Sequence, residues 1–520
     1  MRPRTLGARS RLLVAGALAL TLLLVPASAD AKRAAPAKRA PAKPTVASAL
    51  QGLQRSGTLS ATLYAQYAST YTRATSTLAK LSGTRRAELG AVLANVQQIA
   101  AAGAFIPSRL PALFLTLERN LQWWANQPLL GADQRVSIPG SRIVWEYYPG
   151  QGIEIQWLAT FGEANGYYLQ GHENTQLQEV LNEVIPLATQ RAGGIAWEYM
   201  FHFDGGAPPW TSGLSQGTAL QALARAYSRL KTPAYLTAAQ QALGLFQTPP
   251  PVGVRVATPA GARYAEYTYA PSDRILNGFI QSLNGLYDYA KLTGDPLGRQ
   301  LFEAGDAAAR SEVPAYDTGA WSKYDQYTES NLNYHELLAE FLQDLCTRTD
   351  EGPPVPAAPK APAPPPAATT PTGTTTAPPT TTTTTTGATA ATAARVGATA
   401  GAAQASAAIP GDAIYCSTAQ RFTSDLHTPP AIALLTRTLP AGARGGVQLL
   451  LSKVATVSLS VSRGGHLVWS NSALVEGGKP RLLWITPTKA GAYAVTLHAV
   501  DLAGNSASTT GTIVLRAHRG

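Results

Sequence analysis

Residues 348–412 constrain the fold most, because a segment of this composition cannot form a packed core. Proline and alanine dominate residues 353–379, and residues 380–386 are an unbroken run of threonine. Segments with so little apolar content stay disordered, and a threonine and proline mixture is typical of O-glycosylated linkers in exported proteins. The sequence therefore predicts a disordered linker, with a folded part on each side of it.

The part before the linker has the periodicity of helices. Apolar residues recur at helical spacing from residue 46 to about 127, and residues 134–148 look extended. Further helices are predicted at Ile155–Leu169, Gln176–Thr189, Leu214–Leu230, Pro233–Phe246, Ile275–Leu292, Pro296–Ser311 and Asn333–Leu345. Aromatic, glycine-rich loops separate these helices. By analogy with other paired-helix domains, we expect residues 46–347 to form a mainly α domain of the α/α toroid type.

The part after the linker alternates with a period of two. Short alternating runs lie at 448–452, 454–461, 466–470, 481–485, 492–500 and 506–515, bounded by glycine, asparagine and proline turns. Regularly spaced short strands are typical of a β-sandwich. We therefore expect residues 413–520 to be an all-β module, and residues 491–505 resemble bacterial immunoglobulin-like or fibronectin-like modules.

The N-terminus has the pattern of an export signal. Four arginines precede the apolar run Leu12–Val25, which is too short for a comfortable membrane span, and Ala27–Ala29 matches a small-x-small cleavage site. Residues 1–29 are therefore interpreted as a signal peptide, and residues 30–45 as a basic Ala/Pro tether. The expected location is secreted or cell-envelope associated, with no membrane span after cleavage; the alternative is an uncleaved anchor.

Net charge excludes a nucleic-acid partner. The chain carries +11, but residues 1–43 hold nine basic residues against Asp30 alone and account for +8 of it. The remaining +3 is too little for a basic nucleic-acid-binding surface.

The two cysteines are Cys346 and Cys416. Export permits a disulfide between them, which would staple the helical part to the β module across the linker. Two free thiols are the alternative.

Three clusters in the helical part hold the unusual residues. They comprise Gly193–Tyr199 with Trp210–Gly217 and Arg225–Tyr227, then Tyr264–Pro271 with Ile275–Asp288, and finally Tyr316–Asp325 with Asn333–His335. In order and spacing, over residues 145–345, this set resembles the C-terminal catalytic domain of the D-glucuronyl C5-epimerase family. That family has a Gly-Gly-Trp segment, Trp-x-Ser-x-x-x-Gln-Gly, Arg-Ala-Tyr, a Glu-Tyr pair before Leu-Asn-Gly-Phe, Tyr-Asp-Thr-Gly and two further tyrosines.

The resemblance implies an isomerase that inverts C5 of hexuronate units in a polysaccharide. The C5 hydrogen lies α to a carboxylate, so an enzyme must remove it on one face and return a proton on the other, which requires two acid/base groups. The resemblance places the family's catalytic residues on Glu266, Tyr267, Tyr324 and Tyr334, with Glu266 or Tyr267 acting on one face of the sugar and Tyr334 or Tyr324 on the other. No cofactor and no metal are required, and His172, His202 and His335 are not at metal-ligand spacing.

Further residues are candidates for substrate binding, because aromatic and polar side chains in loops suit a sugar cleft. They are Trp145, Tyr148, Gln151, Trp197, Trp210, Gln216, Arg225, Tyr264, Tyr269, Asn277 and His335.

The sequence departs from the family in two places. The arginine that follows the first closing tyrosine is missing, because Tyr324 is followed by Asp325, Gln326, Tyr327 and Thr328. The family's N-terminal β-rich domain is replaced by predicted helices. Three alternatives therefore stay open: a toroid polysaccharide lyase, a glycoside hydrolase using carboxylates such as Glu198, Asp204 and Glu266, or a non-catalytic envelope glycan-binding protein.

Overall fold

A computed structural model describes residues 43–349 and 413–517. The expected signal peptide 1–29, nearly all of the tether 30–45 and nearly all of the linker 348–412 lie outside these residues. Within the described residues, no helix is long and apolar enough to cross a membrane.

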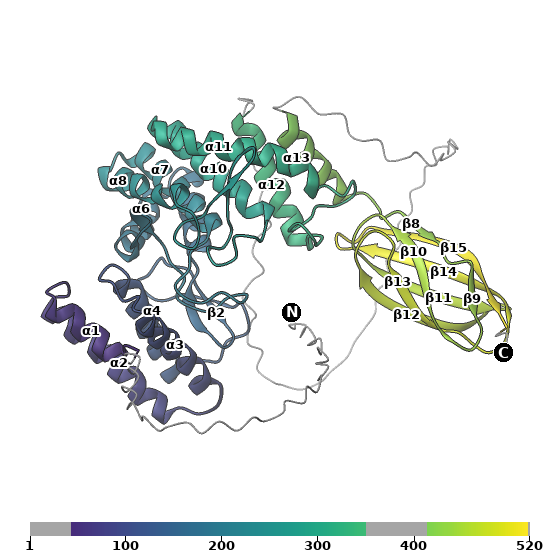
Figure 1. The fold of residues 1–520 in the computed structure, drawn as a ribbon, viewed down its shortest axis with the longest axis horizontal. Helices are drawn as coiled ribbons and strands as arrows, with labels where there is room; N and C mark the ends of the chain where they lie inside the picture. The colour runs from purple at the N-terminus through teal and green to yellow at the C-terminus, as the bar shows by residue number, and fades with distance from the viewer. Residues whose placement is uncertain (1–42, 350–412, 518–520) are drawn as a thin grey trace, which may run out of the picture. The chain divides into compact units, whose positions relative to one another are not determined.

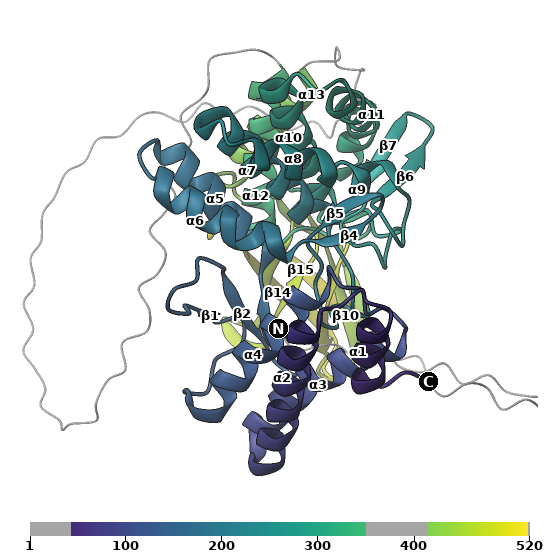
Figure 2. The same ribbon diagram turned by 90° about the vertical axis from the view of Figure 1, so that its left-hand side faces the viewer.

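Four helices form the N-terminal layer, as the periodicity predicts. They are α1 (Val46–Arg55), α2 (Ala61–Lys80), α3 (Gly83–Ala101) and α4 (Leu110–Asn126). Thr45 and Ser60 cap α1 and α2, each accepting a hydrogen bond from a backbone N–H of the first turn. Their buried apolar faces join the main core, and α2, α3 and α4 lie side by side (Figure 2).

A small antiparallel sheet follows, made of β1 (Arg135–Val136), β2 (Trp145–Tyr148) and β3 (Gly152–Ile155) in that order. Side chains alternate between its two faces. One face packs on the N-terminal helices, with the ring of Tyr147 5.5 Å from that of Trp124. The other face carries Glu146, Tyr148 and Glu154, because Glu146 pairs with Glu154 across the hairpin.

The central helices confirm the predicted mainly α part (Figure 1). They are α5 (Trp157–Gln170), α6 (Asn174–Val184), α7 (Gly213–Leu230), α8 (Pro233–Ala242), α9 (Gly244–Gln247), α10 (Leu276–Thr293), α11 (Pro296–Glu312) and α12 (Leu332–Thr349). Consecutive helices pack in pairs. Between them lie the 3₁₀ turns η1 (Ile185–Leu187) and η2 (Val313–Tyr316) and the two hairpins β4 (Thr189–Arg191) with β5 (Gly194–Ala196) and β6 (Arg255–Thr258) with β7 (Gly261–Tyr264).

Helices α7 and α10 form the central contact of this body, and glycines allow their close approach. A Cβ on Gly217 would lie 2.6 Å from the Cα of Ser282, and one on Gly285 would overlap the carbonyl of Gly217. The backbones therefore touch where the helices cross. This crossing fixes the two N-terminal turns, which form the site described below.

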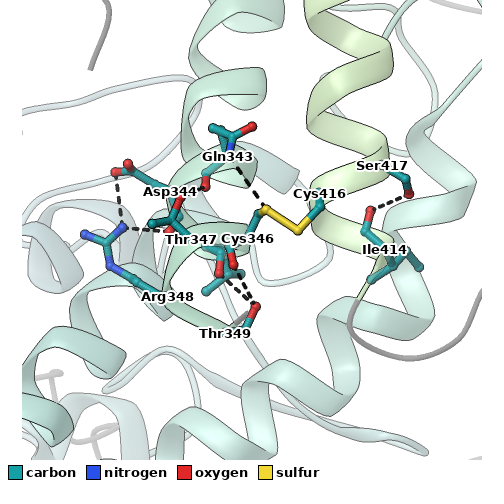
Figure 3. The surroundings of a disulfide bond; sticks show 10 residues. Gln343, Asp344, Cys346, Thr347, Arg348, Thr349, Ile414, Cys416 and Ser417 are labelled. Carbon is teal, nitrogen blue, oxygen red and sulfur yellow. Dashed lines mark hydrogen bonds and ion pairs between the residues drawn. A yellow bond between two sulfur atoms is a disulfide. The ribbon is translucent and has the colours of Figure 1, made fainter. Parts of the chain in front are cut away.

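The expectation that residues 413–520 are all β is wrong at their start. Residues Ala413–Asp425 form a helix, α13, whose Tyr415 and Phe422 are fully buried in the core of the helical part. The predicted Cys346–Cys416 disulfide is present, with Cα atoms 4.8 Å apart. As Figure 3 shows, it joins α12 to α13. The bridge therefore fastens a returning helix within the helical body rather than stapling that body to the β module.

The β module begins at residue 432 and has its own core. Its strands are β8 (Ile432–Leu434), β9 (Thr438–Pro440), β10 (Arg444–Leu451), β11 (Ala455–Arg463), β12 (His466–Val475), β13 (Arg481–Ile485), β14 (Gly491–Asp501) and β15 (Ser506–Arg516). They form one sheet in the order β13-β10-β8 and another in the order β12-β11-β14-β15-β9. The inward-facing residues of both sheets, such as Trp484 and Tyr493, share one core, so the predicted β fold is confirmed.

Candidate functional site

The candidate site lies where the N-terminal turns of α7 and α10 meet the segment after β7. The backbone N–H of Gly213 donates to the carbonyls of Ala265 and Glu266, at 3.1 Å each. The N–H of Leu276, at the start of α10, donates to the carbonyl of Tyr324 at 3.2 Å. These bonds hold three segments that are far apart in the sequence in fixed positions beside one another.

Glu266 is the centre of the site and is buried, with 6% of its surface exposed. The hydroxyl of Ser212, the N-cap residue of α7, lies 3.4 Å from Oε1 and donates to it. Oε2 has no hydrogen-bond partner in the described structure. It lies against Gly278 in the first turn of α10, where a Cβ would overlap it. Gly278 therefore makes the space that the carboxyl occupies.

The surroundings give Glu266 a proton affinity suited to acid/base chemistry at neutral pH. Burial raises the pKa of its carboxyl from 4.5 to about 7, against smaller opposing effects of the Ser212 hydrogen bond and the positive charge of Arg263. A group with this pKa can accept and release a proton near neutrality. The adjacent N-terminal turns of α7 and α10 favour its ionised form.

Three tyrosines surround this carboxyl. The rings of Tyr324 and Tyr334 lie 4.6 Å apart. Burial raises the pKa of Tyr267, and Glu266, Tyr324 and Tyr334 each raise it further, so the four groups lie within electrostatic range of one another. The structure thus brings together the four residues to which the family resemblance assigned catalysis, two from the loop after β7 and two from the segments around α12.

An aromatic wall extends from this cluster. Tyr269 stacks on Tyr267 with centroids 5.2 Å apart, and its hydroxyl is a buried atom without a hydrogen-bond partner. Trp210 lies edge-on to both tyrosines and stacks on Tyr199 at 4.3 Å. Tyr148 of the β2–β3 hairpin continues the wall through Phe201 and Phe203. Tyr199, Phe201 and Trp210 are buried. The partly exposed rings of Tyr148, Tyr267 and Tyr269 are suited to stacking on sugars.

Asn277 also belongs to the site. It is 4% exposed, lies in the first turn of α10 beside Gly278, and its Oδ1 has no hydrogen-bond partner in the described structure. Buried polar atoms without partners are costly, and in native proteins they often mark a place for a ligand. Asn277, Tyr269 and Glu266 each present one such atom.

Other predicted substrate-binding residues have structural contacts instead. Trp197 is fully buried, and its indole N–H donates to the carbonyl of Val184 at 2.9 Å. Gln216 is buried beside it, donating to the carbonyl of Trp197 and accepting from its backbone N–H. Trp210 has a dual position, since its indole N–H donates to the Phe201 carbonyl while its ring faces the tyrosines. Trp197 and Gln216 therefore position the segment before α7 rather than line the site.

Arg225, Tyr264 and His335 are also held within the fold. Arg225 forms a buried ion pair with Asp288 at 2.9 Å. The Tyr264 hydroxyl donates to the carbonyl of Leu301 at 2.5 Å. These contacts, rather than a sugar, account for the burial of both side chains.

His335 stacks on Trp321, with ring centroids 3.6 Å apart. Its Nδ1 accepts from Ser322, and its Nε2 lies 2.9 Å from the carbonyl of Phe422, to which it donates. Burial lowers the pKa of His335 to about 4, so it is neutral near pH 7. It anchors α13 to α12.

Trp145 and Gln151 point into the hairpin packing. Trp145 is fully buried among apolar neighbours. The Oε1 of Gln151 accepts from the side chain of Asn95 and from the backbone N–H of His202. Both hold the β2–β3 hairpin against its neighbours.

Glu198, named as a hydrolase carboxylate, is committed to ion pairs. It bonds to Arg109 and to Arg191, each at 2.6 Å, and is buried. These two arginines lower its pKa against the effect of burial. An acid held ionised between two arginines is poorly suited to proton donation.

Sequence reasoning missed Ser212 and the space-making role of Gly278. Ser212 precedes an apolar helical run, which is the pattern of an N-cap, so that signal was available. Within the described residues, no group of three or more histidine, cysteine, aspartate or glutamate side chains could hold a metal ion.

The fold and the site define a protein whose helical part holds a buried cluster of one carboxyl and three phenols. Residues 191–353 match the family described as the D-glucuronyl C5-epimerase C-terminus. The similarity to this family that the motifs predict is thereby confirmed for this part of the chain.

Individual proteins are similar to parts of this chain. The D-glucuronyl C5-epimerase of Caenorhabditis elegans is 34% identical over 131 residues, which are 23% of this chain and 21% of that protein. An uncharacterized protein of Methanocaldococcus jannaschii is 29% identical over 151 residues, covering 28% of this chain and 49% of its own length. The chain thus spans about a fifth of the first relative and half of the second. An endo-β-1,4-glucanase structure from Acetobacter xylinum aligns over 41% of this chain and 72% of its own, with 12% identity and a TM-score of 0.29.

Proposed function

We propose that this protein is a cofactor-independent epimerase that inverts C5 of hexuronate units within a polysaccharide. The observation that carries the proposal is the buried Glu266 carboxyl, with one oxygen unpartnered and a pKa of about 7, among Tyr267, Tyr324 and Tyr334. The match of residues 191–353 to the D-glucuronyl C5-epimerase C-terminus supports the same reaction class.

In the proposed reaction, Glu266 removes the C5 proton from one face of the sugar ring. Its carboxylate gains a proton as the substrate's carboxylate takes up the charge left at C5. A phenol of the Tyr324–Tyr334 pair then donates a proton to C5 on the opposite face. Burial raises the pKa of all three tyrosines, so each enters the reaction as a neutral proton donor rather than as a phenolate.

Two further parts of the proposal concern setting and architecture. We propose export to the cell surface or medium, which suits the N-terminal sequence pattern and the Cys346–Cys416 disulfide. We also propose that the helix pairs form an α/α toroid around the site and that the β module, of the immunoglobulin-like type, binds glycan or spaces the helical body from the envelope.

Incubation with a glucuronate-containing polymer in deuterated water tests the activity. Deuterium at C5, detected by NMR, is the expected result, together with formation of the inverted uronate. An unsaturated, ultraviolet-absorbing end would instead establish a lyase, because elimination at C4 shares the first proton abstraction. New reducing ends without deuterium would establish a hydrolase. Polymer binding without any turnover would establish a non-catalytic glycan-binding protein.

A further inference from the structure

Glu154, in the middle of β3, differs from the other carboxylates of the hairpin region. It is 2% exposed, and none of the described residues forms a hydrogen bond or ion pair with its carboxyl. Burial alone raises the pKa of this group. A buried carboxyl without a partner destabilises a fold, so its presence requires a compensating role.

Glu88 provides the internal comparison, because it is a buried glutamate on the other side of the same hairpin. Its carboxyl accepts hydrogen bonds from the Tyr147 hydroxyl at 2.8 Å and from the backbone N–H groups of Gly150 and Gly152 at 3.0 Å or less. Glu88 therefore has a structural explanation, fixing the hairpin turn. Glu154 has none of these contacts.

The face of the hairpin that carries Glu154 is continuous with the candidate site. Tyr148 lies on the same face, stacks against Phe201 at 4.7 Å, and accepts a hydrogen bond from Gln156 at 2.7 Å. Gln156 in turn accepts from the Tyr199 hydroxyl at 3.1 Å, and Tyr199 stacks on Trp210. Polar and aromatic groups thus run without a break from the hairpin to the wall beside Tyr267.

The electrostatic interactions of Tyr199 also link the hairpin to the candidate site. Burial raises the pKa of Tyr199, and the carboxylates of Glu266 and Glu146 raise it further. Glu146 pairs with Glu154 in the strand register. Glu146 is itself held by Arg135 at 3.3 Å. Tyr199 therefore lies within electrostatic range of both Glu266 and Glu146. Aromatic faces flanked by carboxyl groups are the chemistry that recognises the rings and hydroxyl groups of pyranoses.

We propose that the hairpin face formed by Tyr148 and Glu154 is a second sugar-contacting surface, in which the Glu154 carboxyl hydrogen-bonds to hydroxyl groups of a pyranose unit in the polymer. The inference rests on the proposed function only in taking a glycan as the ligand. A hydroxyl group of the bound sugar is then the hydrogen-bond partner that the Glu154 carboxyl lacks within the described protein.

The test compares Glu154→Leu with Glu88→Leu by thermal unfolding and by calorimetric titration with a hexasaccharide of alternating glucuronate and N-acetylglucosamine. Glu154→Leu should raise the melting temperature and weaken hexasaccharide binding by about tenfold or more, as expected for the loss of one charged or strong hydrogen bond. Glu88→Leu should lower the melting temperature. Glu154→Gln should gain less stability than Glu154→Leu, because a buried amide without a partner is also destabilising, but it should retain part of the binding, because an amide still donates and accepts.

A lowered melting temperature in Glu154→Leu would overturn the proposal, since it would reveal a structural role. Unchanged hexasaccharide binding, or a wild-type protein that does not bind the hexasaccharide, would overturn it as well. Deuterium exchange at C5 is measured separately. If exchange is absent but Glu154→Leu weakens binding, the epimerase activity fails and the sugar surface stands. If exchange persists in Glu154→Leu with unchanged KM, the surface fails and the activity stands.

Discussion

At the scale of single residues, the protonation of Glu266 should affect both the activity and the stability of the protein. The pKa of this carboxyl rises from 4.5 in the unfolded chain to about 7 in the folded protein. The folded state therefore holds its proton at pH values where the unfolded state has lost it. Stability contributed by this group is fully present below pH 4.5 and is lost as the pH rises to about 7, on the order of 3 kcal/mol in total.

Glu266→Gln should remove this dependence. We expect the variant to match the wild type in unfolding free energy at pH 4 and to exceed it at pH 8, measured by urea denaturation across the range. Its exchange of C5 deuterium should fall by about 10²- to 10⁴-fold, whereas kcat/KM of the wild type should rise with pH up to about 7 as the base ionises. Equal pH profiles of stability in both proteins would contradict the raised pKa.

Gly278→Ala tests the space that Glu266 occupies. The new methyl group meets only the tip of a flexible carboxyl, so the fold should survive, and alanine favours a helix by about 1 kcal/mol. The carboxyl must move, however, and activity should fall at least about tenfold, because a shift near 1 Å is costly in an acid/base site.

Gly217→Ala is the matched control for that substitution. Its methyl group meets the backbone of Ser282 at 2.6 Å, so it should lower the melting temperature of the protein. A Gly278→Ala protein that is fully active, or one destabilised as strongly as Gly217→Ala, would contradict the view that Gly278 makes space for the Glu266 carboxyl alone.

The residues of the site were only partly predictable. The ordered motifs located Glu266, Tyr267, Tyr324 and Tyr334, which the structure brings together. They also nominated Trp197, Gln216 and Arg225, which are equally marked in the sequence but support the site from within the core. A sequence motif indicates that a side chain is important, but it does not show whether the side chain contacts a ligand or packs within the protein. Glu154 shows the converse, because only its missing partners, a three-dimensional property, single it out.

At the scale of elements, periodicity predicted the central helices and the strands of the β module well. It could not predict that α13 returns to the helical core, because the sequence of a short helix next to strands does not show which domain the helix packs against. The disulfide between α12 and α13 links α13 covalently to the helical core, across a sequence separation of 70 residues.

Replacing both Cys346 and Cys416 by serine should therefore destabilise the helical body. Loop closure over this separation predicts a loss of about 4 kcal/mol, since the unfolded chain regains its freedom. Chemical denaturation measures the loss, and hydrogen exchange should rise first in residues 413–425. Reduced wild-type protein should behave like the double variant. If oxidised wild type and the variant were equally stable, the bridge would contribute nothing to the fold.

At the scale of the whole molecule, the two cores are the decisive feature. Tyr415 and Phe422 of α13 belong to the core of the helical part, whereas every member of the second core lies after residue 431. The boundary between the two folding units therefore falls between α13 and β8, and not at the linker before residue 413.

Two shortened chains test this division. A chain ending at residue 430 keeps the whole helical core, so it should fold, retain C5 exchange, and lose only the second of two thermal transitions expected for the full protein. A chain ending at residue 411 lacks α13. It uncovers the apolar surface that Tyr415 and Phe422 cover, worth about 1.5–3 kcal/mol for each large side chain, and leaves His335 without the Phe422 carbonyl. Calorimetry should therefore show a markedly lower first transition for the shorter chain. If both chains melted alike, α13 would be an appendage rather than a part of the core, and if the longer chain failed to fold, the helical body would depend on the β module.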